Sequence, residues 1–182
     1  MTVANADWLV VIDMQHVFGD PASPWFTAGF AAAAERIGAL LPRFAPRVVF
    51  TRFVPPHTID GSWIAYYRRW EFATAPAHAE QWQLVPPWRG SASLDTHRFS
   101  KWGVELRDRI GPSAAAVLCG VSTDCCVLMT ALAAVDDGAF VRVVADACGA
   151  KTQQVHEDAL ALLQTRAPQL TITSTTDELL CG

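Results

Sequence analysis

Short, uninterrupted apolar runs separated by helix-forming segments constrain the fold of this chain more than any other feature. Such runs cover residues 8–12, 47–51, 114–119, 140–144 and 170–173. Each suits one strand buried on both faces and is too short to cross a bilayer. Alanine-rich or helically spaced segments at 27–44, 124–137 and 152–166 alternate with them, and a shorter helix is expected over 102–109. This alternation predicts an α/β fold, a three-layer α/β/α sandwich around a mostly parallel, doubly wound sheet.

The segment 53–94 interrupts this rhythm. It is rich in tryptophan, tyrosine and paired prolines. Three interpretations remain open for it: a wall over a binding site, an oligomer contact, or a separate packing cluster. Because 182 residues suffice for one domain, we expect a single domain over 1–182 that contains this insertion.

Composition narrows the class of protein. Hydrophobic residues make up 51% and charged residues 18% of the chain, which excludes a disordered protein. The net charge of −4 argues against a nucleic-acid partner. Residues 1–7 lack the pattern of a secretory signal, so we expect a cytoplasmic protein with no membrane partner. The surplus of apolar residues predicts a homo-oligomer, a dimer or larger.

Reactive side chains follow several of the expected strands, at the sheet edge where ligands bind in doubly wound folds. Cys125 and Cys126 begin the helix after the strand 114–119, where unpaired amides and the helix dipole stabilise a thiolate. Either could be a nucleophile or a small buried hydrophobe. Asp13 follows the first strand and could be a general base or merely cap a turn. The two groups should lie at the same edge of the sheet.

Several other residues have two interpretations each. Arg52 could clamp a substrate carboxylate or pair with a neighbouring acid. Phe18 and Trp102, together with Trp25, could line an apolar pocket or belong to the core. Gln15, in the loop after the first strand, is a further candidate for substrate binding.

Two motifs together resemble the isochorismatase-like cysteine hydrolases, the superfamily of nicotinamidase and N-carbamoylsarcosine amidohydrolase. They are Val-Ile-Asp-Met-Gln at residues 11–15 and Cys-Gly-Val-Ser-Thr-Asp-Cys-Cys-Val at 119–127. The run at 144–148 is also similar to a strand end of this family, and matching elements extend from about residue 8 to 172. The resemblance implies a six-stranded parallel sheet and a catalytic cysteine, aspartate and lysine.

The family pattern assigns roles to particular residues. It implies that Cys126 is the nucleophile and Asp13 the general base. It also implies a cis peptide between Val121 and Ser122, which would direct the amides of Ser122 and Cys126 toward an oxyanion. The family lysine precedes an aromatic-Ser-x-aromatic run, and in this register Thr96 stands in its place. Lys101 lies nearby as a possible substitute.

No cofactor or metal is expected. The region after the second strand, residues 51–57, lacks the Asp-x-His pair through which some relatives bind metal. The chain also has no phosphate-binding or dinucleotide-binding glycine motif.

The resulting expectation is a cysteine-dependent hydrolase of a C–N bond in a small amide, carbamoyl or ureido compound, acting through a thioester. The alternative is a binding or scaffold protein that keeps the fold but has lost efficient catalysis, because Thr96 occupies the lysine position. A redox-sensitive pair formed by Cys125 and Cys126 is a third possibility, although adjacent cysteines bridge only through a strained ring.

Overall fold

A six-stranded sheet forms the centre of the computed structural model, which describes residues 7–86 and 88–180. The strand order is β3-β2-β1-β4-β5-β6, and every neighbouring pair is parallel. The strands are β1 (Trp8–Ile12), β2 (Val48–Phe53), β3 (Ser93–Thr96), β4 (Ala115–Val121), β5 (Phe140–Gly149) and β6 (Leu170–Thr173). The sequence-based prediction of a doubly wound α/β sandwich is confirmed.

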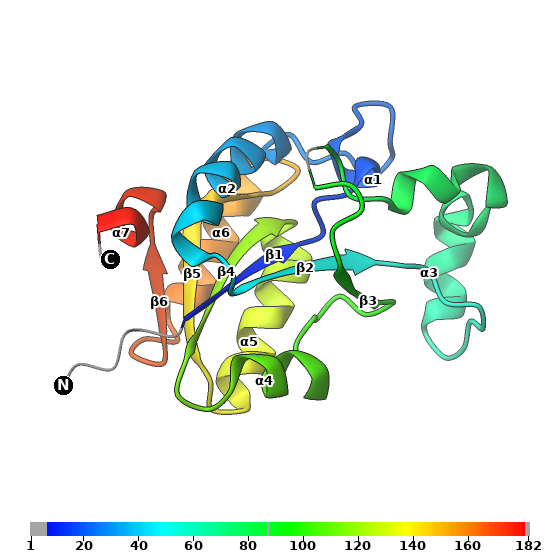
Figure 1. The fold of residues 1–182 in the computed structure, drawn as a ribbon. Coiled ribbons are helices and arrows are strands. Elements are labelled where there is room, and N and C mark those ends of the chain that lie inside the picture. Colours follow the sequence, from blue (N-terminus) through cyan, green and yellow to red (C-terminus); the bar gives the residue numbers. More distant parts are fainter. Residues whose placement is uncertain (1–6, 87, 181–182) are drawn as a thin grey trace.

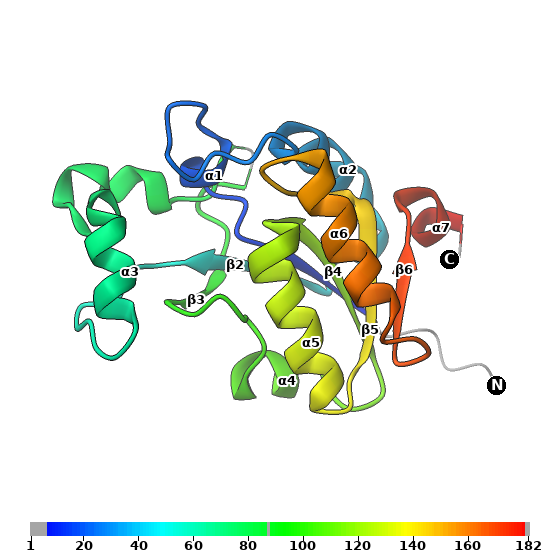
Figure 2. The same ribbon diagram turned by 180° about the vertical axis from the view of Figure 1, so that it is seen from behind.

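Helices cover both faces of the sheet. The helices of the described residues are α1 (His16–Gly19), α2 (Phe30–Phe44), α3 (Trp63–Arg69), α4 (Val104–Ile110), α5 (Leu128–Asp136), α6 (Gln153–Gln164) and α7 (Thr175–Leu180). Figure 1 shows α2 in front of the sheet, and Figure 2, from behind, shows α5 and α6 in front. Among the described residues, no helix combines the length and the apolar character needed to cross a membrane.

The alternation of side chains along β1 divides the core into two layers. Leu9 and Val11 pack in the cluster that includes the buried face of α2, whereas Val10 and Ile12 pack with α4, α5 and α6. All four side chains are fully buried. A strand with both faces covered needs apolar residues at every position, which explains why β1 is an unbroken apolar run.

Gly120 allows β4 to approach β1 closely where both strands end. Its φ is +112°, and a Cβ atom placed there would lie 2.1 Å from the carbonyl oxygen of Ile12. Only glycine adopts this conformation without strain and leaves that space free. The close approach places the turn after β4 beside the residue that follows Ile12.

The segment 53–94 forms α3 and two 3₁₀ turns, η1 (Glu71–Thr74) and η2 (Pro76–Trp82), before β3. The α3 region projects beyond the carboxyl end of β2 (Figure 1). Its aromatic side chains Trp63, Tyr66 and Trp70 pack against the α2 side of the core. These residues therefore pack on the main core and do not form a separate cluster. The next section describes their second role.

Candidate active site

A cavity of about 300 Å³ lies at the carboxyl end of the sheet. Ser122, Cys125 and Cys126, in the turn after β4, form part of its lining. Aromatic side chains from the loop after α1 and from α3, among them Trp25 and Tyr66, line it as well. The cavity therefore lies where ligands bind in doubly wound sheets, and part of the segment 53–94 forms its wall.

Asp13 follows β1 directly, and its side chain is completely buried. Its φ of +51° lies in the left-handed region, which is uncommon for a residue other than glycine. The Thr51 hydroxyl donates to Oδ1 at 2.8 Å, and the Asp13 amide donates to Thr51 Oγ1 at 3.3 Å. A buried carboxylate needs such partners because it has lost its water.

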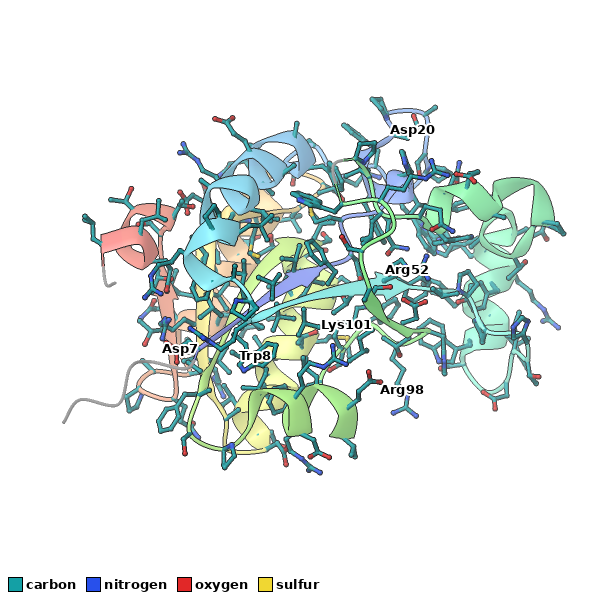
Figure 3. All side chains as sticks on the ribbon, in the orientation of Figure 1. Asp7, Trp8, Asp20, Arg52, Arg98 and Lys101 are labelled. Atoms are coloured by element: carbon teal, nitrogen blue, oxygen red, sulfur yellow. The ribbon has the colours of Figure 1, made fainter. Side chains whose placement is uncertain are left out.

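Lys101 is the charged partner of Asp13. Its Nζ lies 2.8 Å from Asp13 Oδ2, and it donates to the carbonyl oxygen of Arg98 at 3.0 Å. Nζ also lies 5.3 Å from the centre of the Phe53 ring. These contacts offset the cost of removing two charges from water. Figure 3 shows Lys101 close to β2, while the side chain of Arg98 extends away from the molecule.

Thr96, which the sequence register places at the family lysine, does not contact Asp13. It ends β3, and its Oγ1 accepts a hydrogen bond from the Arg98 amide at 3.1 Å. His97 lies against the Trp63 ring, with 6.3 Å between ring centres. The ammonium group beside Asp13 therefore comes from a residue five positions later, in the loop between β3 and α4.

Cys126 lies in a π-helical turn, Thr123–Val127, which follows a cis peptide bond between Val121 and Ser122. The amides of Cys125 and Val127 both donate to the Ser122 carbonyl at 3.1 Å. A hydrogen bond with Cys125, burial and the Asp13 charge raise the pKa of Cys126 well above its ordinary value, although Lys101 acts in the opposite direction. The raised pKa favours the protonated form of this thiol.

Thr130, on α5, joins the lysine loop to the cysteine turn. Its Oγ1 accepts a hydrogen bond from the Lys101 amide at 2.9 Å and donates to the Cys126 carbonyl at 2.6 Å. Thr130 is fully buried. One hydroxyl thus fixes the backbone at both Lys101 and Cys126.

Of three other candidate site residues, one lines the cavity and two are bonded elsewhere. Phe18 lines the cavity beside the cysteine turn. Trp102 lies elsewhere, because its indole N–H donates to Asp137 at 2.9 Å and it does not line this cavity. Gln15 is buried, and its amide group bonds the backbone of Phe53 and Trp82 at 2.8–2.9 Å.

Arg52 pairs with a neighbouring acid, the second of its two expected interpretations. Its Nε donates to Asp95 at 2.9 Å, and Nη1 donates to Gln83 at 3.0 Å. The hydrogen bond to Asp95 raises the pKa of Arg52, while burial acts against it. With these donors engaged, Arg52 joins β2, β3 and the loop after η2, and it does not line the cavity.

Sequence reasoning gave no role to Thr51 or Thr130, the two hydroxyls that bond Asp13 and the cysteine turn. Thr51 ends the apolar run 47–51, which was a usable signal, although β2 continues to Phe53. A threonine inside α5 offers no such signal. Within residues 7–86 and 88–180, no three His, Cys, Asp or Glu side chains are grouped so as to hold a metal ion.

Comparison with known proteins agrees with this geometry. Residues 7–178 match the isochorismatase domain family. The chain belongs to the isochorismatase family. Comparison with curated proteins found no significant match.

Solved structures share the fold along almost the whole chain. An isochorismatase-like hydrolase from Alkaliphilus metalliredigens has a TM-score of 0.78 at 18% identity, over 98% of this chain and 99% of that one. A cysteine hydrolase from Pseudomonas syringae pv. phaseolicola also has a TM-score of 0.78 at 18% identity, over 97% and 96%. Nicotinamidase from Bacillus subtilis has a TM-score of 0.73 at 19% identity, over 93% and 99%.

Proposed function

We propose that this member of the isochorismatase family is a cysteine hydrolase that cleaves a C–N bond in a small amide, carbamoyl or ureido compound. The observation that carries the proposal is the buried Asp13–Lys101 pair, whose charges both act on the Cys126 thiol at the cavity. A base, a cation that orients it, and a nucleophile together are the requirements for covalent catalysis. The mechanism has two halves.

In the first half, Asp13 takes the proton of the Cys126 thiol as sulfur attacks the substrate carbonyl carbon. The new S–C bond forms while the carbonyl π electrons move to oxygen, giving an oxyanion. When the oxyanion collapses, the C–N bond breaks, and the protonated Asp13 gives its proton to the leaving nitrogen. Ammonia or an amine departs and a thioester remains. Lys101, whose Nζ lies 2.8 Å from Asp13 Oδ2, orients the carboxylate before the attack.

In the second half, a water molecule replaces the amine. Asp13 takes a proton from the water as its oxygen attacks the thioester carbon. The C–S bond then breaks, and the Cys126 thiolate recovers the proton from Asp13 as the product acid leaves. Atoms and charges return to the starting state.

The oxyanion is assigned to the amides of Ser122 and Cys126. Both residues line the cavity, and Cys126 lies in the first turn of the helical segment that follows Ser122. Backbone amides at such a position stabilise negative charge without reorganisation. This assignment rests on position along the turn and on the family resemblance.

Release of ammonia or amine from a panel of small amides, carbamoyl and ureido compounds tests the proposal. Wild-type protein should hydrolyse at least one compound, and Cys126→Ala should lose at least about 10³-fold in kcat. Cys148→Ala, which removes another buried thiol, is the matched control and should keep its activity. Retained turnover in Cys126→Ala would contradict the mechanism.

The same assay separates hydrolase from the alternative, a catalytically impaired binding protein. That alternative was motivated by Thr96, whereas the contact between Lys101 and Asp13 supports the hydrolase. A wild-type protein that binds amides but hydrolyses none would favour it.

A further inference from the structure

The wall of the cavity is built from aromatic rings that are already packed before a ligand enters. The Trp25 ring lies 5.8 Å from Tyr66 and 6.0 Å from Trp70, measured between ring centres. Tyr66 in turn lies 5.6 Å from Phe99. All four line the cavity. A flat apolar group that enters would contact ring faces and edges without first reorganising them.

The cations near this wall are committed to protein groups. Lys101 contacts Asp13 and the Arg98 carbonyl, and Arg52 bonds Asp95 and Gln83. Among the described residues that line the cavity, the charged ones are Asp124 and Lys151, and both are exposed. An exposed lysine offers a substrate anion only a weak, screened attraction.

A substrate carboxylate held against this aromatic wall would lose its hydrating water and gain no fixed polar partner in its place. Burial of a charge without a partner is strongly unfavourable, whereas burial of an apolar group lowers the free energy of binding. We propose that the cavity selects amides whose acyl group is uncharged and apolar, aromatic rings above all, and rejects amides that carry a second, anionic group. This proposal rests on the proposed hydrolase function and names its substrate class.

Matched pairs of amides test the selection with the full chain. Hexanamide and adipamate differ only in a terminal methyl or carboxylate group, and 3-phenylpropanamide and succinamate differ in a phenyl or carboxylate group. We expect kcat/KM for the uncharged member of each pair to exceed that of the anion by about 100-fold or more, since a hydrophobic pocket discriminates about 10–200-fold per methylene alone. A preference for the anions would overturn the substrate class and leave the hydrolase function standing.

A new cation at the wall should weaken the preference for uncharged amides. Phe26 lines the cavity and is half-buried, so Phe26→Arg places a guanidinium where a substrate carboxylate could pair with it. The adipamate-to-hexanamide ratio of kcat/KM should rise at least about tenfold, the effect of one charge-assisted contact. Phe140→Arg, at an exposed phenylalanine outside this cavity, is the control and should keep the wild-type ratio. An equal change in both variants would contradict the proposal.

Measurements of ligand binding test the substrate class without requiring that the amide is hydrolysed. In the Cys126→Ser variant, quenching of tryptophan fluorescence by 3-phenylpropanamide should occur at a concentration at least about tenfold below that for succinamate. If no amide is hydrolysed but this binding order holds, the proposed function fails and the ligand class stands. Equal or reversed binding overturns the ligand class whatever the activity.

Discussion

The Nζ of Lys101 lies 2.8 Å from Oδ2 of Asp13, and neither side chain is exposed to solvent. Lys101 reaches this carboxylate from a loop, five residues beyond the position at which the motif register places the family lysine. Because both charges are buried, loss of either would leave the other without a partner. The pair should therefore affect the stability of the fold as well as catalysis.

Lys101→Met should lower kcat by about 100-fold, because Asp13 loses the cation that orients it. It should also lower the free energy of unfolding by about 3–5 kcal/mol, because a buried carboxylate is left without its charged partner. Amide hydrolysis and urea titration measure the two effects. Thr96→Ala should change kcat less than about twofold, since the Thr96 hydroxyl only caps the Arg98 amide. A large loss in Thr96→Ala with normal activity in Lys101→Met would contradict the assignment.

Alkylation of Cys126 should be slow at neutral pH and rise with pH. Its pKa is raised, so the thiolate that reacts is scarce until the pH approaches that higher value. The negative charge of Asp13 contributes to the raised pKa of Cys126, so Asp13→Asn should lower that pKa. Iodoacetamide should then label Cys126 faster at a fixed pH of about 8, while hydrolysis is lost. Peptide mapping locates the label. Asp60→Asn, at an exposed aspartate, should leave the rate unchanged; slower labelling in Asp13→Asn would refute the electrostatic argument.

Thr130→Val removes the hydroxyl between the Lys101 amide and the Cys126 carbonyl at nearly constant volume. The Lys101 amide and the Cys126 carbonyl then lose their hydrogen bonds to this hydroxyl, which should cost about 1–3 kcal/mol of unfolding free energy. Because the loop and the turn are no longer joined, kcat should fall more than KM rises. Thr165→Val, which removes an exposed hydroxyl, should change stability by less than about 0.5 kcal/mol. Equal effects of the two substitutions would show that Thr130 has no special role.

Gly120→Ala should be among the most damaging single substitutions in the chain. The new Cβ would lie 2.1 Å from the Ile12 carbonyl oxygen, so β4 could not keep its place beside β1. We expect a loss above about 4 kcal/mol, or no soluble protein. Gly138→Ala also has a positive φ but open space around it, and should cost only about 1–2 kcal/mol. Thermal unfolding distinguishes them, and similar midpoints would contradict the steric argument.

Arg52→Met should leave kcat/KM within about threefold of wild type, since Arg52 does not line the cavity. Its pair with Asp95 is partly exposed, so the loss of stability should be about 1 kcal/mol or less. A rise in KM specific to anionic amides would instead restore Arg52 as a substrate clamp.

The strands and the turn that carries Cys126 were predictable because their causes are local. Residues 8–12 and 170–173 are apolar runs that became β1 and β6 with those bounds. Asp13 and Cys126 follow parallel strands, and parallel strands bring their carboxyl ends together. The expected helix over 124–137 was less accurate, because its first turn is π-helical and only Leu128–Asp136 is α-helical.

The role of Lys101 was not predictable in the same way. Its direction depends on the bond between its amide and Thr130, which lies 29 residues away on α5. The partners of Arg52 likewise come from β3 and from the loop after η2. Such contacts have no local signature. Self-association also stays a prediction, which sedimentation velocity at micromolar concentration would test.

In the proposed hydrolase, Cys126 forms a covalent acyl intermediate with Asp13 and Lys101 beside it. The most direct test of this intermediate is the intact mass of the enzyme quenched in acid during hydrolysis of an amide, followed by peptide mapping. We predict a mass increase equal to the acyl group, located on Cys126 and absent from Cys126→Ala. Steady turnover with unmodified Cys126, or an adduct at another residue, would contradict the account.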